Sequence, residues 1–498
     1  MQQLSKSDYL LFLRHPAWLW LKKHRKNALP EPDAALKALF ASGHRFETFA
    51  EQRFPDAITL GFNDFSEYRD LPRRTQTALA NGASTIFQGR FEHGRTTCII
   101  DVLQRVEDNV FDLFEIKAST SAKSEHIPDL AFQLMVLEGT GIEIRNLGVI
   151  HVNRDYVRAG QIDPTDISSQ TDVTRKVREI AGETISQVDE ALQIIDLAEM
   201  PSISPRHLKS GSMSDWLEIF EGLAKPFEKY SIYNLASIKA EQVGTLEDAG
   251  AVSITDIPDD LELTERQERQ VTAVKTGQRA INSDAIGSFL GAVEYPLYFL
   301  DYETFSDVIP AFDGIRPYQQ VPFQYSLHIR RGPSEELEHR EFLHEENSNP
   351  VPALLAQLVQ DIGDKGSVIV WHDPFETRRN TEMGEMSPPH AEFLANVNDR
   401  VIDLIDPFKY GWFVDKDFFG SSSIKKVLPV LAPDLSYEAL DIQDGESAKQ
   451  IWMDVVLHGK QAVQRQKVFA DLRTYCTLDT LAMVRIFDVL SDLENLET

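Results

Sequence analysis

The stretch Leu297-Tyr-Phe-Leu-Asp-Tyr-Glu-Thr-Phe305 determines how the C-terminal part of the chain is interpreted. It begins as an apolar, strand-forming run and ends in two carboxylates, Asp301 and Glu303. Side chains spaced by two residues lie on one face of a strand. Two acids on one face repel each other unless a cation lies between them, and hard oxygen ligands suit Mg²⁺ or Mn²⁺. Taken alone, the motif is better explained as an exposed strand end that carries two solvated acids.

Three later segments supply further acids in chain order. Residues 367–376 read as a strand, a turn and a helix start, which would bring Asp373 and Glu376 near the end of the first strand. Residues 401–406 form a third strand-like run, whose two aspartates we interpret as support for the strand end. A helix over 469–490 places Tyr475 and Asp479 four residues apart, on one face. The core stripe of that helix is expected to consist of Leu472, Cys476, Met483, Phe487 and Leu490.

This order of motifs resembles the tyrosine subtype of the DEDD 3′–5′ exonucleases over residues 295–495. The resemblance implies a ribonuclease-H-like α/β fold and a site with two divalent ions. The implied metal ligands are Asp301, Glu303, Glu376 and Asp479. Tyr475 would contact the attacking water. The second motif departs from the family pattern, which has asparagine and aspartate where Asp373 and Glu376 stand, so Asp373 is an alternative ligand.

Basic residues follow in a segment that begins Gly420-Ser-Ser-Ser. The serines predict the N-cap of a helix whose first turns carry Lys425 and Lys426. These lysines are candidates for binding a nucleic-acid backbone, although a capped helix with surface lysines explains them equally well. Together with 433–438 and Asp444-Gly445, the segment resembles an uncharacterised bacterial family that joins an exonuclease-like domain to a RecB-like front end.

A second constellation lies near the N-terminus. Residues 98–106 and 110–117 predict two strands of a hairpin whose turn is centred near Asp108. Asp101 and Glu115 are each seven residues from that centre, so they should face each other about 5 Å apart. Two facing carboxylates again indicate a metal site. Lys117 lies on the same strand face as Glu115, where its ammonium can stabilise charge.

This arrangement resembles the PD-(D/E)XK nucleases, specifically their RecB-like branch, over residues 1–160. The opening segment 4–9 agrees with that branch. The resemblance implies metal binding by Asp101, Glu115, Glu47 and His44, and catalytic roles for Lys117 and Gln133. Related nucleases hold an iron–sulfur cluster through four cysteines, but His15-Pro16 occupies the first such position and the chain has only 2 cysteines, so no cluster is expected.

Length and composition set the frame for both constellations. A chain of 498 residues suggests about three domains. We expect a restriction-endonuclease-like α/β core over 1–165, a mostly helical connector over 166–290 and the ribonuclease-H-like domain over 291–498. The turn at Asp248–Val252 is either a helix-hairpin-helix element or part of a plain helical connector. The lack of a long apolar run predicts no membrane span, and the two distant cysteines fit a reducing cytoplasm.

The formal net charge of −28 argues against a broad basic surface. The acids are unevenly placed, however, because residues 241–270 hold nine acids and two bases, whereas the first sixty hold nine bases and six acids. The function we expect is a two-site, metal-dependent DNA nuclease in repair, recombination or defence. A nucleic-acid-binding scaffold with inactive sites is the alternative. RNA stays open as a substrate because neither constellation distinguishes the sugar.

Overall fold

A computed structural model describes residues 2–496 and separates them into two compact units. The first unit contains the chain up to Lys225 together with Asp307–Tyr318, and the second contains Pro226–Ser306 and the chain from Gln319 onward. Both units combine helices with mixed sheets, which confirms the expected multi-domain α/β class. The boundary at Lys225 divides the segment 166–290, which the sequence suggested as one connector.

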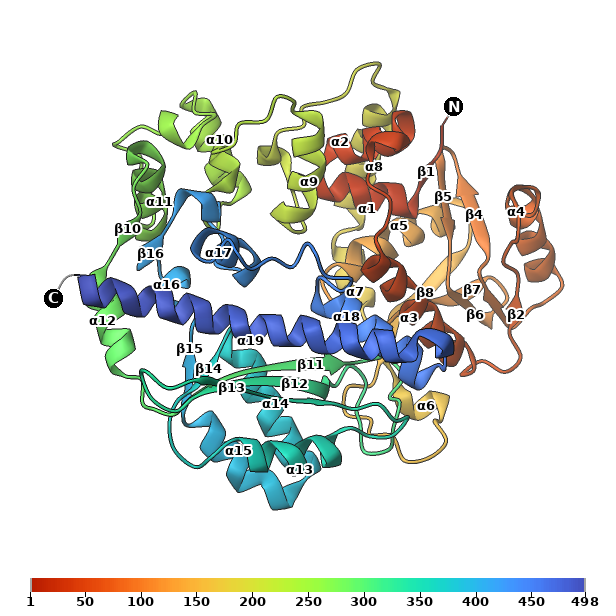
Figure 1. Ribbon diagram of the computed structural model, residues 1–498. Helices are drawn as coiled ribbons and strands as arrows, with labels where there is room; N and C mark the ends of the chain where they lie inside the picture. The colour runs from red at the N-terminus through yellow and green to blue at the C-terminus, as the bar shows by residue number, and fades with distance from the viewer. Residues whose placement is uncertain (1, 497–498) are drawn as a thin grey trace. The chain divides into compact units, whose positions relative to one another are not determined.

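The first unit is built on a six-stranded sheet of order β2-β3-β6-β7-β8-β9 (Figure 1). Its strands are β2 (Ile58–Thr59), β3 (Thr85–Phe87), β6 (Val102–Glu107), β7 (Val110–Lys117), β8 (Glu143–Val152) and β9 (Ser168–Asp172). β7 and β8 are parallel, whereas β6 and β9 run antiparallel to their respective neighbours. A smaller sheet contains β1 (Leu4–Ser5), β5 (Thr96–Ile99) and β4 (Arg90–His93).

Helices complete the first unit. They are α1 (Lys6–Arg14), α2 (Pro16–His24), α3 (Ala34–Glu51), α4 (Phe65–Ala80), α5 (His126–Gly139), α6 (Pro164–Ile167), α7 (Thr174–Glu179), α8 (Ala181–Asp196) and α9 (Met213–Leu223). α5 connects β7 to β8 and is apolar almost all round, so it is buried between other elements. Its one polar stretch on the inside carries Asp129 and Gln133, both almost fully buried.

The predicted hairpin is present, but its first strand is interrupted. β6 and β7 pair antiparallel with Val102 opposite Phe114, the register obtained from a turn at Asp108. The expected single strand over 98–106 is wrong, because β5 ends at Ile99 and belongs to the smaller sheet. Asp101 lies in the bend between the two strands. Alternation of side chains along a sequence does not show that a chain passes from one sheet to another.

The segment Asp307–Tyr318 follows β11 of the second unit in sequence and packs within the first unit. Val308 is fully buried in the same apolar cluster as Phe87 and Phe114. The Arg45 guanidinium donates two hydrogen bonds to Asp307, at 2.8 and 2.7 Å. At the other end, the Tyr318 hydroxyl donates to the Ala118 carbonyl at 2.6 Å. The first unit is therefore completed by residues far from it in sequence.

The second unit contains a five-stranded sheet of order β13-β12-β11-β14-β15. Its strands are β11 (Leu297–Phe305), β12 (Val321–Arg330), β13 (Leu337–Leu343), β14 (Val368–Val370) and β15 (Val401–Asp403). The first three strands along the chain pair antiparallel, while β14 and β15 run parallel to β11. The strands predicted at 297–305, 367–370 and 401–403 are confirmed, and β11 is the central one. A short ladder pairs β10 (Ala280–Ile281) with β16 (Phe413–Val414).

The helices of the second unit are α10 (Ala240–Asp248), α11 (Glu265–Thr276), α12 (Ser283–Gly291), α13 (Val351–Asp361), α14 (Asp373–Met386), α15 (Ala391–Asn398), α16 (Asp406–Lys409), α17 (Ile424–Leu431), α18 (Gly445–Trp452) and α19 (Arg465–Leu496). The long α19 packs against β11 and β12 (Figure 1). All five residues predicted for its core stripe are buried. This packing fixes where the polar side of α19 meets the sheet.

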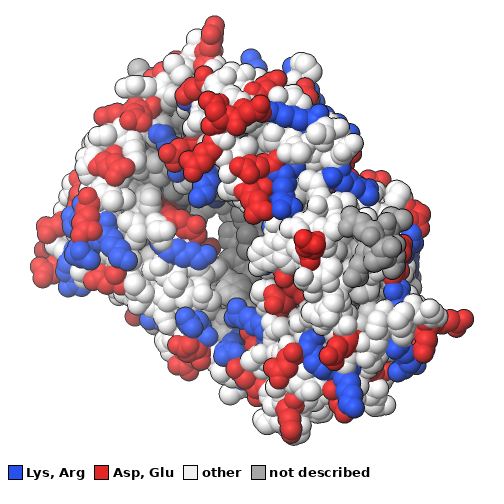
Figure 2. Space-filling view, turned by 90° about the vertical axis from the view of Figure 1, so that its left-hand side faces the viewer, with Lys and Arg blue, Asp and Glu red and all other residues white. Residues whose placement is uncertain are grey.

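Surface charge is mixed in sign. On the face shown in Figure 2, acidic and basic side chains are interspersed and neither sign forms a continuous sheet of charge. In the part of the chain that the structure covers, no helix combines the length and hydrophobicity needed to cross a bilayer.

We predict that Val308→Asp destabilises the first unit by several kcal/mol, because it buries an unpaired carboxylate in an apolar cluster. Hydrogen exchange should show loss of protection in β3, β6 and β7, with β11 and β12 much less affected. Val157→Asp, at a half-exposed position of the same unit, is the matched control and should leave exchange unchanged. Equal behaviour of the two variants would contradict the assignment of 307–318 to the first core.

Candidate functional site

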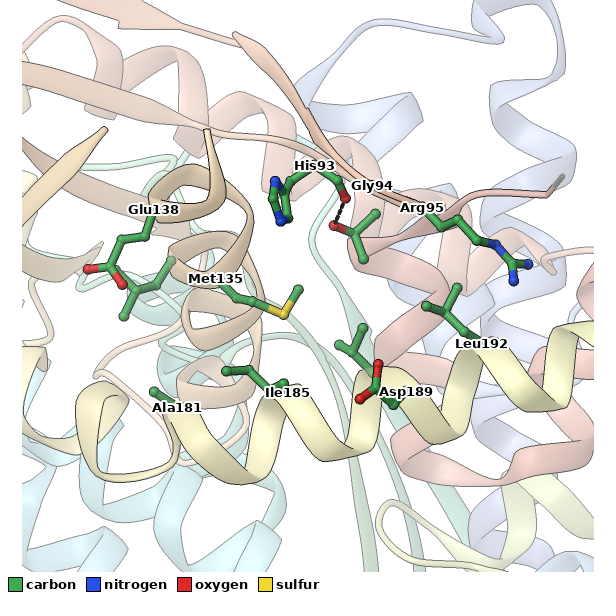
Figure 3. A pocket seen from close by; sticks show the side chains of 12 residues that line it. His93, Gly94, Arg95, Met135, Glu138, Ala181, Ile185, Asp189 and Leu192 are labelled. Atoms are coloured by element: carbon green, nitrogen blue, oxygen red, sulfur yellow. Dashed lines mark hydrogen bonds between the residues drawn. The ribbon is translucent and has the colours of Figure 1, made fainter. Parts of the chain in front are cut away.

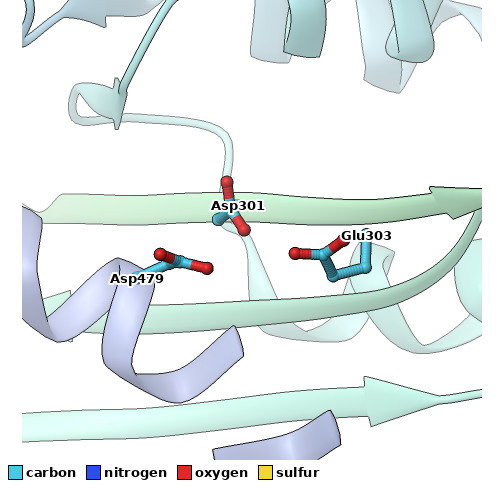
Figure 4. A group of neighbouring side chains, drawn as sticks. All are labelled: Asp301, Glu303 and Asp479. Atoms are coloured by element: carbon cyan, nitrogen blue, oxygen red, sulfur yellow. The ribbon is translucent and has the colours of Figure 1, made fainter. Parts of the chain in front are cut away.

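Three carboxylates meet in the second unit. Asp301 and Glu303 on β11 and Asp479 on α19 each offer an oxygen, and these oxygens lie within 4.8 Å of one another. Figure 4 shows the three groups turned toward a common point between the strand and the helix. Among the described residues, this is the one group of three or more acids, histidines or cysteines gathered so closely. The structure thus brings together three of the four ligands implied by the sequence.

Local structure explains this convergence. Asp301 and Glu303 share a face of β11 through strand alternation, and Asp479 belongs to the side of α19 that faces the sheet. The stacking of Trp452 on Phe305 and Phe323, at 4.8 and 4.5 Å between ring centroids, fixes α18 over the end of β11. A Cβ on Gly445, at the start of α18, would lie 3.3 Å from Glu303 Oε2. The helix start therefore approaches Glu303 closely.

Glu376 is the fourth predicted ligand. It lies in the first turn of α14, is 2% exposed, and its Oε2 is buried without a hydrogen-bond partner in the described structure. Burial raises its pKa well above the usual value, and the negative charge of Asp301 raises it further. An unsatisfied buried carboxylate oxygen is costly. A cation beside Asp301 would remove that cost, so the donor set fits a divalent ion.

The alternative ligand, Asp373, occupies a different environment. Asp403 accepts the backbone N–H groups of His372 and Asp373, at 2.8 and 3.0 Å, which fixes the turn between β14 and α14. His372 adopts a left-handed conformation there, with φ of 85°. Burial, followed by the charge of Asp403, raises the pKa of Asp373. Asp403 thus fixes the turn through two hydrogen bonds, and its charge raises the pKa of both Asp373 and Glu376.

The electrostatics of the cluster favour protons or cations. Burial, together with mutual repulsion, raises the pKa of Asp301 and Glu303 well above their ordinary values. Burial also raises the pKa of Asp479 to about 6, although hydrogen bonds from Tyr437 and Tyr475 oppose the shift. A divalent ion held by these oxygens would reverse the shifts.

Two tyrosines lie beside Asp479. Tyr475, predicted from the Y-x-x-x-D motif, is buried, and its hydroxyl opposes the rise in the pKa of Asp479. The second is Tyr437, whose hydroxyl donates to Asp479 Oδ1 at 2.6 Å. The sequence analysis missed Tyr437 as a site residue. Its one signal was its position in the segment 433–438, which contributed to a family resemblance without a chemical role.

The two predicted phosphate-binding lysines are both exposed on α17. Lys425 Nζ donates to the Gln443 carbonyl at 2.7 Å, and its charge lowers the pKa of both Glu303 and Asp479. Lys426 lies 6.0 Å from the Phe419 ring instead. Ser423 occupies the N-cap position, but its side chain makes no capping hydrogen bond. Lys425 is therefore the lysine within electrostatic range of the carboxylates.

In the first unit, Glu115 is the centre of a dense polar group. Its Oε1 accepts from Lys117 and from Lys6, both at 2.7 Å, and its Oε2 accepts from Gln133 at 2.7 Å. Asp129 binds the same Lys117 at 2.8 Å. Burial opposes ionisation of Glu115, but the charges of Lys6 and Lys117 dominate and lower its pKa. Lys6 and Asp129 were not predicted, because neither belongs to the E-x-K motif.

Asp101, Glu47 and His44 were also predicted for this site, and they differ in how closely they approach Glu115. Asp101 Oδ2 accepts the Ile116 N–H at 2.8 Å, which places it across from Glu115 as the hairpin arithmetic predicted. Burial and the charge of Glu115 raise its pKa, and Glu47 contributes to that shift. Glu47 accepts from Gln88. His44, whose side chain is 81% exposed, contacts Glu47 at 3.2 Å and points largely to solvent.

A separate pocket of about 480 Å³ lies between α5, α8 and the turn from β4 to β5 (Figure 3). Most of its lining is aliphatic, from residues such as Leu134, Ile185 and Leu192. Two of its three charged residues are engaged elsewhere: Arg95 binds Asp196 through two hydrogen bonds, and Glu138 pairs with Arg178. The third is Asp189 on α8. The pocket shares no residue with either carboxylate group.

We predict that Asp301→Asn stabilises the metal-free protein at pH 7.5 by about 2–6 °C in melting temperature, because it removes repulsion among buried acids. Raised folded-state pKa values mean that protons favour the fold. Protonation of the cluster therefore stabilises the folded state fully below about pH 4. This stabilisation is lost as the pH rises through about 6, the pKa of Asp479.

Melting curves in EDTA should consequently show a smaller difference between wild type and Asp301→Asn at pH 4.5 than at pH 7.5. Without EDTA, Mn²⁺ should raise the melting temperature of the wild type more than that of the variant, whose first-unit carboxylates are unchanged. Asp260→Asn, an exposed aspartate of the same unit, is the control. A melting temperature for Asp301→Asn that is pH-independent relative to wild type would show that the cluster is not under electrostatic strain.

Comparison with known proteins covers the second unit in part. Residues 298–423 match a sequence family described as a domain of unknown function (DUF2779). The chain is also 26% identical over 215 residues to "Uncharacterized protein MG366" of Mycoplasma genitalium, and 26% identical over 210 residues to its homolog in Mycoplasma pneumoniae. Each alignment covers 39% of this chain and 32% of the relative, so the chain matches about a third of their length. The family match includes Asp301, Glu303 and Glu376.

Proposed function

We propose that this protein is a metal-dependent nuclease with a 3′–5′ exonuclease-like site in the second unit and a RecB-like nuclease site in the first. The observation that carries the proposal is the meeting of Asp301, Glu303 and Asp479 within 4.8 Å, beside the unsatisfied carboxylate of Glu376. Glu303 and Glu376 are buried, Asp301 and Asp479 are half-buried, and none of the four forms an ion pair with a lysine or arginine in the described part of the chain. Such a group of carboxylates is a typical arrangement for binding two divalent ions. The substrate we propose is DNA.

Strand topology supports the exonuclease assignment. Numbered along the chain, the five strands of the sheet lie in the order third, second, first, fourth, fifth, with the second antiparallel to the first. This is the arrangement expected of a ribonuclease-H-like fold. The ligands come from the first strand, from the helix after the fourth strand and from the last long helix, in the order that the resemblance implies.

The residues of the second unit have separable roles in phosphodiester hydrolysis. Asp301, Glu303, Glu376 and Asp479 would hold the ions. When bound, such ions supply Lewis-acid activation of a water and charge stabilisation at the phosphate. The Tyr475 hydroxyl would orient the attacking water. Lys425, exposed beside the carboxylates, would bind a backbone phosphate of the substrate.

The first unit supports a second hydrolytic site. Asp101 and Glu115 face each other, and Lys117 is held against Glu115 and Asp129. Asp101, Glu115 and Glu47 would form the acidic side of the site. The Lys117 ammonium would stabilise negative charge on the phosphate. Gln133 holds Glu115 from α5, at 2.7 Å. The chemistry of neither site distinguishes ribose from deoxyribose. Parallel assays with DNA and RNA therefore decide the sugar preference.

We predict that the purified protein degrades 3′-labelled single- or double-stranded DNA in Mn²⁺ and that Asp301→Ala lowers this exonuclease rate about 100-fold or more. The reason is loss of a shared metal ligand. Asp260→Ala, at an exposed position of the same unit, should retain the wild-type rate. RNA in parallel reactions tests the sugar preference.

The nuclease proposal would be contradicted if the protein bound DNA with a Kd independent of Mn²⁺ and cleaved neither DNA nor RNA. That result would favour a nucleic-acid-binding scaffold.

A separate prediction concerns the first site. Lys117→Ala should lower cleavage in a background of Asp301→Ala about 100-fold, because charge stabilisation at the phosphate is lost. Lys123→Ala, an exposed lysine six residues later, serves as the control. Product lengths on long duplex DNA measure the activity that survives in Asp301→Ala. Residual cleavage insensitive to Lys117→Ala would remove the catalytic role of the first unit.

A further inference from the structure

Two tyrosines from different elements lie close to Asp479, and one of them donates a hydrogen bond to it. Tyr475 lies one helical turn before Asp479 on α19, and Tyr437 approaches from the segment that follows α17. The Tyr437 hydroxyl donates to Asp479 Oδ1 at 2.6 Å, and the two tyrosine rings have centroids 6.1 Å apart. Both rings are buried, at 8% exposure for Tyr437 and 4% for Tyr475. The Tyr437 hydroxyl thus orients the carboxylate of Asp479.

The segment that carries Tyr437 is anchored independently of the site. Asp434 accepts two hydrogen bonds from the Arg485 guanidinium of α19, both at 2.9 Å. Such bidentate pairs fix direction as well as distance. The Lys425 ammonium lies 5.8 Å from the Tyr437 ring centroid. Tyr437 is therefore positioned by α19 itself, the helix that carries Asp479.

A tyrosine hydroxyl has one proton, so it can donate to one acceptor at a time. A Tyr475 hydroxyl that donated to Asp479 could not also donate to a water or a phosphate oxygen. Because Tyr437 supplies the donor to Asp479, the Tyr475 proton is not needed there. A single tyrosine hydroxyl could not hold the metal ligand and contact the substrate at the same time.

We propose that Tyr437 is the positioning residue that orients Asp479 for metal binding, which leaves the Tyr475 hydroxyl available to the reacting groups. This inference rests on the proposed metal-dependent function of the second unit. It assigns the two tyrosines different effects: Tyr437 acts on metal affinity, and Tyr475 acts on turnover.

The test is Mn²⁺ binding by the full-length protein in the absence of nucleic acid, measured by calorimetry and restricted to the sites that Asp301→Asn removes. Tyr437→Phe should weaken this binding about 10- to 100-fold, as expected for loss of a group that orients a ligand. Tyr475→Phe should bind Mn²⁺ within about threefold of wild type and lose cleavage rate. Asp434→Asn, which frees the Tyr437 segment, should weaken Mn²⁺ binding in the same direction as Tyr437→Phe.

The matched control is Tyr325→Phe. Tyr325 is also buried and donates to an aspartate of the same unit, Asp361, but it points to the opposite face of the sheet from Asp301. It should leave Mn²⁺ affinity unchanged. Circular dichroism confirms that each variant is folded.

Wild-type Mn²⁺ affinity in Tyr437→Phe, or equal losses in Tyr437→Phe and Tyr475→Phe, would overturn the division of roles. Failure of the proposed function gives a different result, in which the wild type binds Mn²⁺ but cleaves neither DNA nor RNA. Absence of any Mn²⁺ binding that depends on Asp301 overturns both.

Discussion

Mutual repulsion among buried carboxylates is the constraint on which the second unit depends. Asp301, Glu303 and Asp479 are held within a few ångströms of one another, with Glu376 nearby, although each charge raises the free energy of the others. Apolar packing opposes this repulsion: the buried stripe of α19 lies against β11 and β12, and Trp452 is stacked on the end of β11. The apolar framework thus holds the acids rigidly at the place where their charges repel each other most. Such preorganisation is typical of ligand sets whose geometry is fixed before the cation arrives.

The two carboxylate groups are compensated in different ways. In the first unit, Lys6 and Lys117 neutralise Glu115, and Gln133 completes its hydrogen bonding. In the second unit, the Tyr437 hydroxyl donates to Asp479 but supplies no positive charge, and Lys425 acts from the exposed side of the site. The carboxylate of Glu115 is therefore neutralised by neighbouring lysines. Among the described residues, the buried oxygen without a partner is the amide Oε1 of Gln133 in the first group and the carboxylate Oε2 of Glu376 in the second. A net charge of −28 is compatible with both, because the compensation is local.

The sequence was informative wherever local periodicity determined structure. The D-x-E spacing, the stripe of α19 and the symmetry of the hairpin about Asp108 predicted which side chains share a face, and the structure has those faces and that register. It was uninformative where a contact depends on the path of the chain. The bend at Asp101 separates two sheets, and Tyr437 reaches Asp479 across 42 residues. Lys6 likewise meets Glu115 across 109 residues. No pattern within one segment encodes such pairings, so these residues emerged only from the fold.

The excursion of residues 307–318 has a consequence for how this chain can change over evolutionary time. Val308 and Tyr318 complete the first unit, yet they are encoded after β11, the strand that carries Asp301 and Glu303. A recombination event that exchanged one half of the gene at the Lys225 boundary would deprive the recipient of the inserted residues, or supply an insertion adapted to another partner. Two units that look separable by their motifs are therefore inherited as a single block. Exchange of either unit alone would require loss of the segment 307–318. It would also require new side chains to fill the place of that segment in the core of the first unit.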